Sequence, residues 1–265
     1  MYLKEKLKLG PVYGIAVFTG ASCVVEAVGN HGYDFVFLDL EHTPIDAANG
    51  IEKLIMCALR TGVSPLVRTA DTDEFTLRKL MEMGAEGVIV PHTRTAKDVA
   101  EMVHAIKFPP IGRRGADSAV RAAGFGGPGF KWEEYIKSQN DHTMIIPMDE
   151  DYEFTDNIEE IMDHPGVDAI NFGPLDYALS IGVPIRYKMD APKVAYAFKR
   201  LVELAGPRGI GVMAPCVPPT PEYARELIAM GANMPIMGND LYHFQRGIGA
   251  AMQDNVNIMR DEKKR

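Results

Sequence analysis

Phe35-Val-Phe-Leu-Asp-Leu-Glu-His-Thr-Pro44 is the stretch that decides the fold, because an apolar strand pattern ends here in three groups that can move protons or hold a metal. Buried strands seldom end in a cluster such as Asp39, Glu41 and His42. Two later apolar runs end in a similar way: Met144-Ile-Ile-Pro-Met-Asp-Glu150, and, after a turn, Asp168-Ala-Ile-Asn-Phe-Gly-Pro-Leu-Asp176. Three charged strand ends indicate one shared pocket.

Short β-rich runs alternate along the chain with amphipathic helical patterns. The predicted strands span residues 12–18, 34–41, 65–69, 87–92, 143–150, 168–173, 210–214 and 233–238. The predicted helices include residues 73–84, 96–107, 192–205 and 221–231, each closed by Gly or Pro. Eight such units in about 250 residues match the α/β class and a (β/α)8 TIM barrel of the phosphoenolpyruvate/pyruvate type.

A doubly wound open sheet is the alternative arrangement. It needs a Gly-rich phosphate turn after the first strand, and Phe18-Thr-Gly-Ala-Ser22 contains neither GxGxxG nor GxxxxGK[ST]. The barrel is therefore favoured.

One connection, from Thr93 to His142, is much longer than the others and contains a Gly-rich run, Gly124-Phe-Gly-Gly-Pro-Gly-Phe130. Long loops in compact domains are usually functional or disordered. We expect the loop near residues 108–130 to be a mobile lid or a subunit contact. A phosphate cradle is disfavoured because the run has no Lys-Ser/Thr ending.

Composition restricts the class of protein further. The 265 residues, 46% hydrophobic and 24% charged, suit one large domain over residues 1–265. A net charge of −8 argues against a nucleic-acid partner. Cys23, Cys57 and Cys216 form no CxxC pair, which predicts a reducing cytoplasmic setting. No signal peptide and no run of about 18 apolar residues is present, so we expect no membrane partner.

In a barrel, the C-terminal ends of the strands face one site. The polar residues expected there are Asp39, Glu41, His42, Arg68, His92, Glu150 and Asp176. This mixture of carboxylates, imidazoles and a guanidinium predicts a metal-assisted acid/base site.

Each of these groups has a functional and a structural interpretation. Glu150 and Asp176 are hard oxygen ligands suited to Mg²⁺ or Mn²⁺, and the alternative is that each caps the helix that follows. Arg68 is a permanent cation able to stabilise an enolate oxygen, and the alternative is an ion pair with a carboxylate of the second strand. His42 is the natural proton carrier.

Several covalent mechanisms lose support. None of the predicted strands contains a lysine, which disfavours a Schiff-base aldolase. The chain has no GxSxG elbow, and no cysteine lies at a predicted strand end beside a histidine. Enolate chemistry would therefore have to rely on a metal.

Four blocks make the chain resemble the HpcH/HpaI aldolase family, the metal-dependent class II pyruvate aldolases. Members include 4-hydroxy-2-oxoheptanedioate aldolase and 2-dehydro-3-deoxyglucarate aldolase. The blocks are Asp39-Leu-Glu-His-Thr-Pro44, Leu66-Val-Arg68, Pro109-Pro-Ile-Gly-Arg-Arg-Gly115 and Gly173-Pro-Leu-Asp176, which resemble D-x-E-H-x-P, an arginine strand, P-P-x-G-x-R-G and G-P-x-D. They occur in the family's order, and the resemblance covers nearly the whole chain.

The resemblance implies a divalent metal, Mg²⁺, Mn²⁺ or Co²⁺, on Glu150 and Asp176, with the keto acid bound to it. It implies that His42 is the base, supported by Asp39, and that Arg68 stabilises the enolate oxygen. The substrate-binding residues that it implies are Arg68, Met148, Gly173, Pro174 and Arg114, the last for an anionic acceptor aldehyde. It also implies a homo-oligomer, commonly a hexamer, in which the C-terminal helix and tail contact another subunit.

One position departs from the family pattern. Met148 stands where the family usually has Gln, two residues before Glu150, and a thioether cannot hydrogen-bond a keto acid comparably. Asn171 is a polar residue inside an apolar strand and needs a hydrogen-bonding neighbour.

The expected function is reversible cleavage of a 4-hydroxy-2-keto acid or a 2-keto-3-deoxy sugar acid to pyruvate and an aldehyde, through a metal-stabilised enolate. Two alternatives stay open. One is a citrate-lyase-like carbon–carbon lyase acting on an acyl-CoA, and the other is a non-catalytic ligand-binding barrel.

Overall fold

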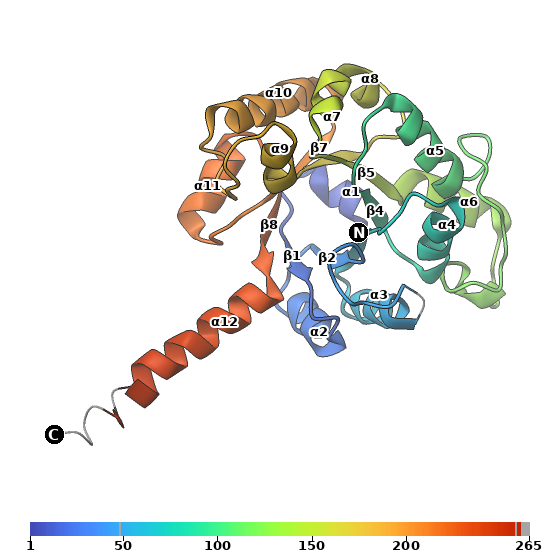
Figure 1. Cartoon of the computed structure of the whole chain (residues 1–265). Helices are drawn as coiled ribbons and strands as arrows, with labels where there is room; N and C mark the ends of the chain where they lie inside the picture. Colours follow the sequence, from blue (N-terminus) through green and yellow to red (C-terminus); the bar gives the residue numbers. More distant parts are fainter. Residues whose placement is uncertain (48, 258, 261–265) are drawn as a thin grey trace.

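The computed structural model describes residues 1–47, 49–257 and 259–260, and within these ranges eight parallel strands close into a barrel (Figure 1). The strands are β1 (Gly14–Val17), β2 (Phe35–Asp39), β3 (Ser64–Arg68), β4 (Gly87–Val90), β5 (Met144–Asp149), β6 (Ala169–Phe172), β7 (Gly211–Pro215) and β8 (Met234–Asn239). Each strand pairs with the next in sequence, and β1 pairs with β8. The predicted barrel is confirmed, and the open sheet is excluded.

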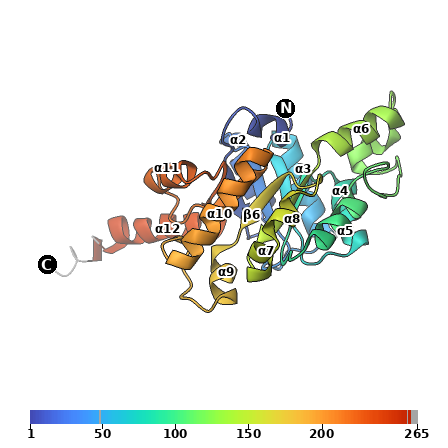
Figure 2. The same cartoon turned by 90° about the horizontal axis from the view of Figure 1, so that it is seen from above.

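Helices surround the strands (Figures 1 and 2). They are α1 (Leu3–Leu7), α2 (Ser22–Asn30), α3 (Asn49–Thr61), α4 (Glu74–Met83), α5 (Ala96–Ile106), α6 (Trp132–His142), α7 (Tyr152–Asp156), α8 (Ile158–Met162), α9 (Pro174–Ser180), α10 (Pro192–Arg208), α11 (Pro221–Ala229) and α12 (Asp240–Ala251), with the 3-10 turn η1 (Arg121–Gly126) and the π-helical turn η2 (Met252–Asn257). The sequence marks α4 clearly: Asp73 accepts a hydrogen bond from Thr76 N at its start, and left-handed Gly84 ends it.

Side chains alternate along each strand between two cores. In β2, Phe35 and Phe37 belong to the cluster inside the barrel, whereas Val36 and Leu38 pack against the surrounding helices. The strands are buried on both faces, which is why their sequences read as continuous apolar runs.

The N-terminal end of the barrel is closed by α1, which crosses its centre in Figure 1. Leu3 is fully buried and packs in the same cluster as the residues inside the barrel. Its backbone N–H donates to Glu86, and Lys4 forms an ion pair with Asp168. Ligands therefore reach the barrel from the opposite end, where the strands terminate.

The long connection is more ordered than expected. Its start and end belong to α5 and α6, and Phe108, Ala123 and Tyr135 form a small apolar cluster of their own between these helices. The remaining backbone includes the η1 turn. The loop is thus packed onto its own core, while its predicted role as a lid or subunit contact stays a prediction.

The last helix, α12, leaves the body of the barrel (Figures 1 and 2). Four large apolar side chains along α12 and at its end are more than two-fifths exposed: Leu241, Phe244, Ile248 and Met252. The predicted C-terminal tail from residue 261 lies outside the described residues. Among the helices that the structure describes, none has the length and apolarity needed to span a membrane.

Candidate active site

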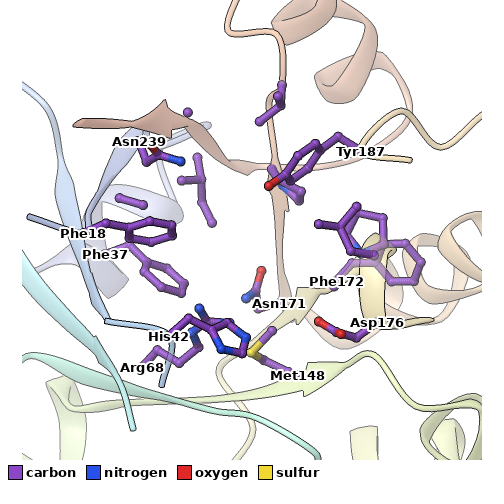
Figure 3. A pocket seen from close by; sticks show the side chains of 18 of the residues that line it. Phe18, Phe37, His42, Arg68, Met148, Asn171, Phe172, Asp176, Tyr187 and Asn239 are labelled. Carbon is purple, nitrogen blue, oxygen red and sulfur yellow. The ribbon is translucent and has the colours of Figure 1, made fainter. Parts of the chain in front are cut away.

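A cavity of about 390 Å³ opens at the C-terminal ends of the strands, where the polar strand ends were expected to meet. Figure 3 shows His42, Arg68, Met148, Asn171 and Asp176 on one side of this cavity. Of the three charged strand ends, two contribute a side chain to the lining of this cavity, His42 and Asp176, whereas Glu150 is buried and is not among the lining residues.

Asp39 and Arg68 form the buried centre of this site. They are neighbours in register on β2 and β3, and Arg68 donates from Nε to Asp39 Oδ1 at 2.7 Å and from Nη2 to Oδ2 at 2.9 Å. Arg68 Nη1 lies 2.8 Å from Glu41 Oε2, in an ion pair without hydrogen-bond geometry. Burial would lower the pKa of Arg68, but Asp39 and Glu41 outweigh it and raise that pKa. The predicted ion pair therefore exists, and the same guanidinium still borders the cavity.

His42 follows this pair on an exposed turn. Its side chain is 62% exposed, and its Nε2 lies 3.7 Å from Glu41 Oε2. Asp39 accepts hydrogen bonds from the backbone N–H groups of Glu41 and His42, not from the imidazole. Asp39 therefore stabilises the backbone turn that carries His42 and makes no hydrogen bond to its imidazole. The carboxylate beside the imidazole is that of Glu41.

His92, at the end of β4, is the second histidine of the site. Its left-handed backbone, with φ of 51°, directs its N–H to Glu150 Oε1 at 2.6 Å. Its ring Nδ1 lies 3.2 Å from Asp151 Oδ2. Burial would lower the pKa of His92, but this contact and the charges of Glu150, Asp151 and Glu41 outweigh it and raise the pKa. A positive φ outside glycine is uncommon and often marks functional positions.

Glu150 is a buried carboxylate at the end of β5, only 1% exposed. Its pKa is raised by burial, and the charges of Glu41 and Asp176 add to the effect while the His92 N–H offsets part of it. The capping interpretation does not hold: α7 begins after Asp151 and α9 begins after Gly173, and neither start has a side-chain cap. Glu150 and Asp176 are thus free of the structural role that competed with metal binding.

Gly173 explains how the Glu150 carboxylate is accommodated. A Cβ on Gly173 would lie 2.8 Å from Glu150 Cβ and 3.0 Å from its Oε2, closer than real side chains approach. Gly173 and Pro174 both border the cavity, as does Asp176 one turn later. The missing Cβ leaves room for the carboxylate beside the G-P-x-D turn.

These residues fit a hard divalent ion. Among the described residues no cluster of three or more His, Cys, Asp or Glu is arranged as a metal site. Mg²⁺ and Mn²⁺, however, typically take one or two carboxylates and leave other positions to water and substrate. The charge of Asp176 contributes to the raised pKa of Glu150, and a cation between the two carboxylates would relieve that repulsion.

Arg114 is not part of this cavity. It is 3% exposed, lies 4.5 Å from the centre of the Phe108 ring, and donates hydrogen bonds to Gln139 and Tyr135. Within the chain it therefore holds the long loop against α6. Its predicted contact with an acceptor aldehyde receives no support from this placement.

Much of the remaining lining of the cavity is apolar and was not foreseen. It includes Phe18, Phe37 and Tyr187, which Figure 3 labels, and also Ile185. Phe18 and Thr19 are held by the buried carboxylate of Asp240, which accepts both backbone N–H groups at 2.9 and 3.0 Å. Phe37 lies within β2, but the others follow a strand or lie in loops without periodicity, so for them the only available signal was the aromatic residue directly after the first strand.

A parallel barrel with proton carriers, a cation and carboxylates around one cavity at the strand ends defines a (β/α)8 enzyme. A sequence profile described as HpcH/HpaI aldolase/citrate lyase matches residues 18–246, and the chain belongs to this family. It is an enzyme, a carbon–carbon lyase of the aldolase type. Divalent-metal dependence is typical of aldolases of this family.

Named relatives cover most of the chain. A 2-keto-3-deoxy-L-rhamnonate aldolase of Escherichia coli O17:K52:H18 (strain UMN026 / ExPEC) is 29% identical over 89% of this chain and 86% of its own. A 2-dehydro-3,6-dideoxy-6-sulfogluconate aldolase of Pseudomonas putida is 30% identical over 86% of each chain. The crystal structure of citrate synthase SbnG superposes with a TM-score of 0.86 at 26% identity, covering 98% of this chain and 99% of that one.

Proposed function

We propose that this protein is a divalent-metal-dependent aldolase that reversibly cleaves a 4-hydroxy-2-keto acid or a 2-keto-3-deoxy sugar acid to pyruvate and an aldehyde. The observation that carries the proposal is that Arg68 and Asp176 border one cavity, while the buried carboxylate of Glu150 lies close enough to both to interact with them electrostatically. The names of the two aldolase relatives support a keto-deoxy acid as the substrate.

Glu150 and Asp176 would hold Mg²⁺, Mn²⁺ or Co²⁺. When bound, such an ion supplies Lewis-acid polarisation of the substrate's keto group. Arg68 faces the same space as a cation whose direction is fixed by Asp39, so it stabilises the negative charge that develops on the enolate oxygen. Because the guanidinium is already oriented in the free protein, little reorganisation is needed when that charge appears.

His42 carries the protons in this proposal. Cleavage requires that the C4 hydroxyl lose a proton as the C3–C4 bond breaks, and the resulting enolate must gain a proton at C3. The imidazole lies at the cavity but is largely exposed, so it can exchange protons with water between these two events. Glu41 Oε2 lies 3.7 Å from the imidazole Nε2.

The first test is exchange of the pyruvate methyl protons for deuterium in D₂O, followed by NMR with Mg²⁺ or Mn²⁺ and repeated with EDTA. Exchange requires enolisation but no aldehyde, so it tests the donor half of the reaction alone. We expect metal-dependent exchange in the wild type and its loss in Glu150→Ala, with Glu160→Gln, an exposed carboxylate on α8, as the control. Exchange that survived EDTA and Glu150→Ala would contradict the proposal.

The proposed partners are small molecules and further copies of the chain. The exposed apolar residues of α12 support a homo-oligomer, for which the family resemblance suggests a hexamer. Three free cysteines agree with a reducing cytoplasmic setting.

A further inference from the structure

The groups that would bind the keto acid lie together in the cavity. Figure 3 shows Arg68 and Asp176 in the lower part of the view, Asn171 above them and Tyr187 in the upper part. Asn171 is buried, and its side-chain oxygen has no hydrogen-bond partner among the described residues. In the proposed reaction, the carboxylate and keto oxygens of pyruvate bind at this polar end. The aldehyde half of the substrate therefore meets a different part of the lining.

Leu179, Ile185 and Tyr187 form an apolar wall in that part of the cavity. Leu179 belongs to α9, and the other two lie between α9 and α10. All three side chains are more than two-fifths exposed. Asn239, which also lies in the upper part of the view, accepts a hydrogen bond from Tyr242 N with its side-chain oxygen, at 2.8 Å. Exposed apolar side chains grouped in one place mark a binding surface, and these three line the catalytic cavity.

The apolar wall has no cation available to an anionic ligand. Among the described residues that line the cavity, only Arg68 and His42 can carry a positive charge. Arg68 is engaged by two carboxylates, and His42 is the proposed proton carrier. The cations beside the wall in sequence, Arg186 and Lys188, do not line the cavity, and Arg114 is enclosed by its own loop. An anionic aldehyde would therefore find no counter-ion here.

We propose that the aldehyde half of the substrate carries an uncharged, apolar carbon chain, which packs against Leu179, Ile185 and Tyr187. Such contact removes apolar surface of both the ligand and the wall from water. A carboxylate in the same place would lose hydration without gaining a counter-ion. This inference rests on the proposed function and restricts it to 4-hydroxy-2-keto acids whose chain beyond C4 is apolar.

The first experiment measures aldol addition to aldehydes of increasing chain length. The full-length protein, with Mn²⁺ and saturating pyruvate, is given propanal, butanal or pentanal, and aldol formation is followed by NMR. We expect kcat/KM for the aldehyde to rise roughly two- to fourfold with each methylene, as burial at a partly exposed apolar wall predicts. A flat or falling series would overturn the proposal, and it is the result expected if a second copy of the chain covers the wall.

The second experiment compares 4-methylpentanal with succinic semialdehyde, because an isopropyl group has nearly the shape of a carboxylate. We expect the wild type to prefer 4-methylpentanal about tenfold or more in kcat/KM. Ile185→Arg places a cation at the wall and should reduce this preference roughly fivefold or more, whereas Ile185→Met should retain it. Equal use of the two aldehydes by the wild type, or an unchanged preference in Ile185→Arg, would overturn the assignment.

Ile111→Arg is the matched control for the introduced charge. Ile111 is 52% exposed and Ile185 53%, but Ile111 does not line the cavity. The preference between the two aldehydes should therefore be that of the wild type. A change in preference as large as that of Ile185→Arg would show that added charge acts without contact at the wall, and the proposal would fail.

Deuterium exchange into pyruvate separates this inference from the proposed function, because exchange needs no aldehyde. Metal-dependent exchange without addition to the apolar aldehydes, or with a preference for anionic or polyhydroxylated ones, would refute the apolar acceptor alone. A wild type without metal-dependent exchange would instead refute the proposed function itself.

Discussion

At the scale of single residues, Asp39 organises the site. Its two oxygens accept two hydrogen bonds from Arg68 and one each from the N–H groups of Glu41 and His42. It is completely buried, so these bonds are shielded from water. One carboxylate thus fixes both the guanidinium of Arg68 at the cavity and the turn that carries His42.

We expect Asp39→Ala to lower the free energy of unfolding by about 3 kcal/mol, because it leaves a buried guanidinium without its main partner. Urea unfolding followed by circular dichroism measures this loss, and pyruvate exchange should fall with it. Glu101→Ala is the control, since it breaks the exposed Lys97–Glu101 pair on α5 and should change stability little. A loss below about 1 kcal/mol in Asp39→Ala would show that Glu41 alone holds Arg68.

At the scale of elements, the turn from β6 into α9 lies against the end of β5, the strand that Glu150 follows. Gly173 N donates to Asp149 O at 3.0 Å, so the start of α9 is tied to the end of β5. Pro174 occupies the first position of α9, where its fixed φ suits a helix and no N–H is needed. The turn therefore positions Asp176 relative to Glu150 through backbone alone.

Gly173→Ala should move the Glu150 carboxylate, because the new Cβ would overlap it. We expect roughly a tenfold or larger loss of metal-dependent exchange, since small displacements of catalytic groups are costly. The apparent metal affinity, obtained from the Mn²⁺ dependence of exchange, should weaken too. Gly206→Ala in α10 is the matched control because a Cβ there meets nothing within 4 Å. Equal activity of both variants would contradict the role of the turn.

At the scale of the whole molecule, α12 lies apart from the barrel that the other helices surround (Figure 1). An exposed apolar stripe on one helix marks an interaction surface when it is contiguous. Leu241, Phe244 and Ile248 are spaced by three and four residues, which places them on one face. This face supports the proposed contact with another copy of the chain.

Phe244→Glu should dissociate the oligomer, because it places a charge in an apolar contact. Light scattering coupled to size exclusion would then give a mass nearer the 29.2 kDa of one chain. Tyr196→Glu on α10 is the control, since Tyr196 is 65% exposed and Phe244 63%. A wild-type protein that already elutes as a monomer would refute the contact.

Much of this architecture could be predicted from sequence because buried strands and amphipathic helices have different hydrophobic periods. The charged strand ends could be predicted because each follows an apolar strand pattern. The sequence blocks containing Asp39, Arg68 and Asp176 located most of the site. The cavity's apolar wall, with Phe18 and Tyr187, could not be predicted, because loop residues have no period that shows what they face. Arg114 was assigned through a motif, and only packing shows that it is enclosed by its own loop.

Because α1 closes the N-terminal end of the barrel, it restricts how substrates and products enter and leave. Since Leu3 is fully buried in the cluster inside the barrel, ligands do not pass through the N-terminal end of the barrel, and we expect them to enter the cavity at the ends of the strands. Both products of a cleavage must leave by the route through which the reactant came in. We expect the fragment that binds against Arg68 to leave after the fragment nearer the opening. The closed N-terminal end of the barrel would thus determine the order in which the two products leave at the other end.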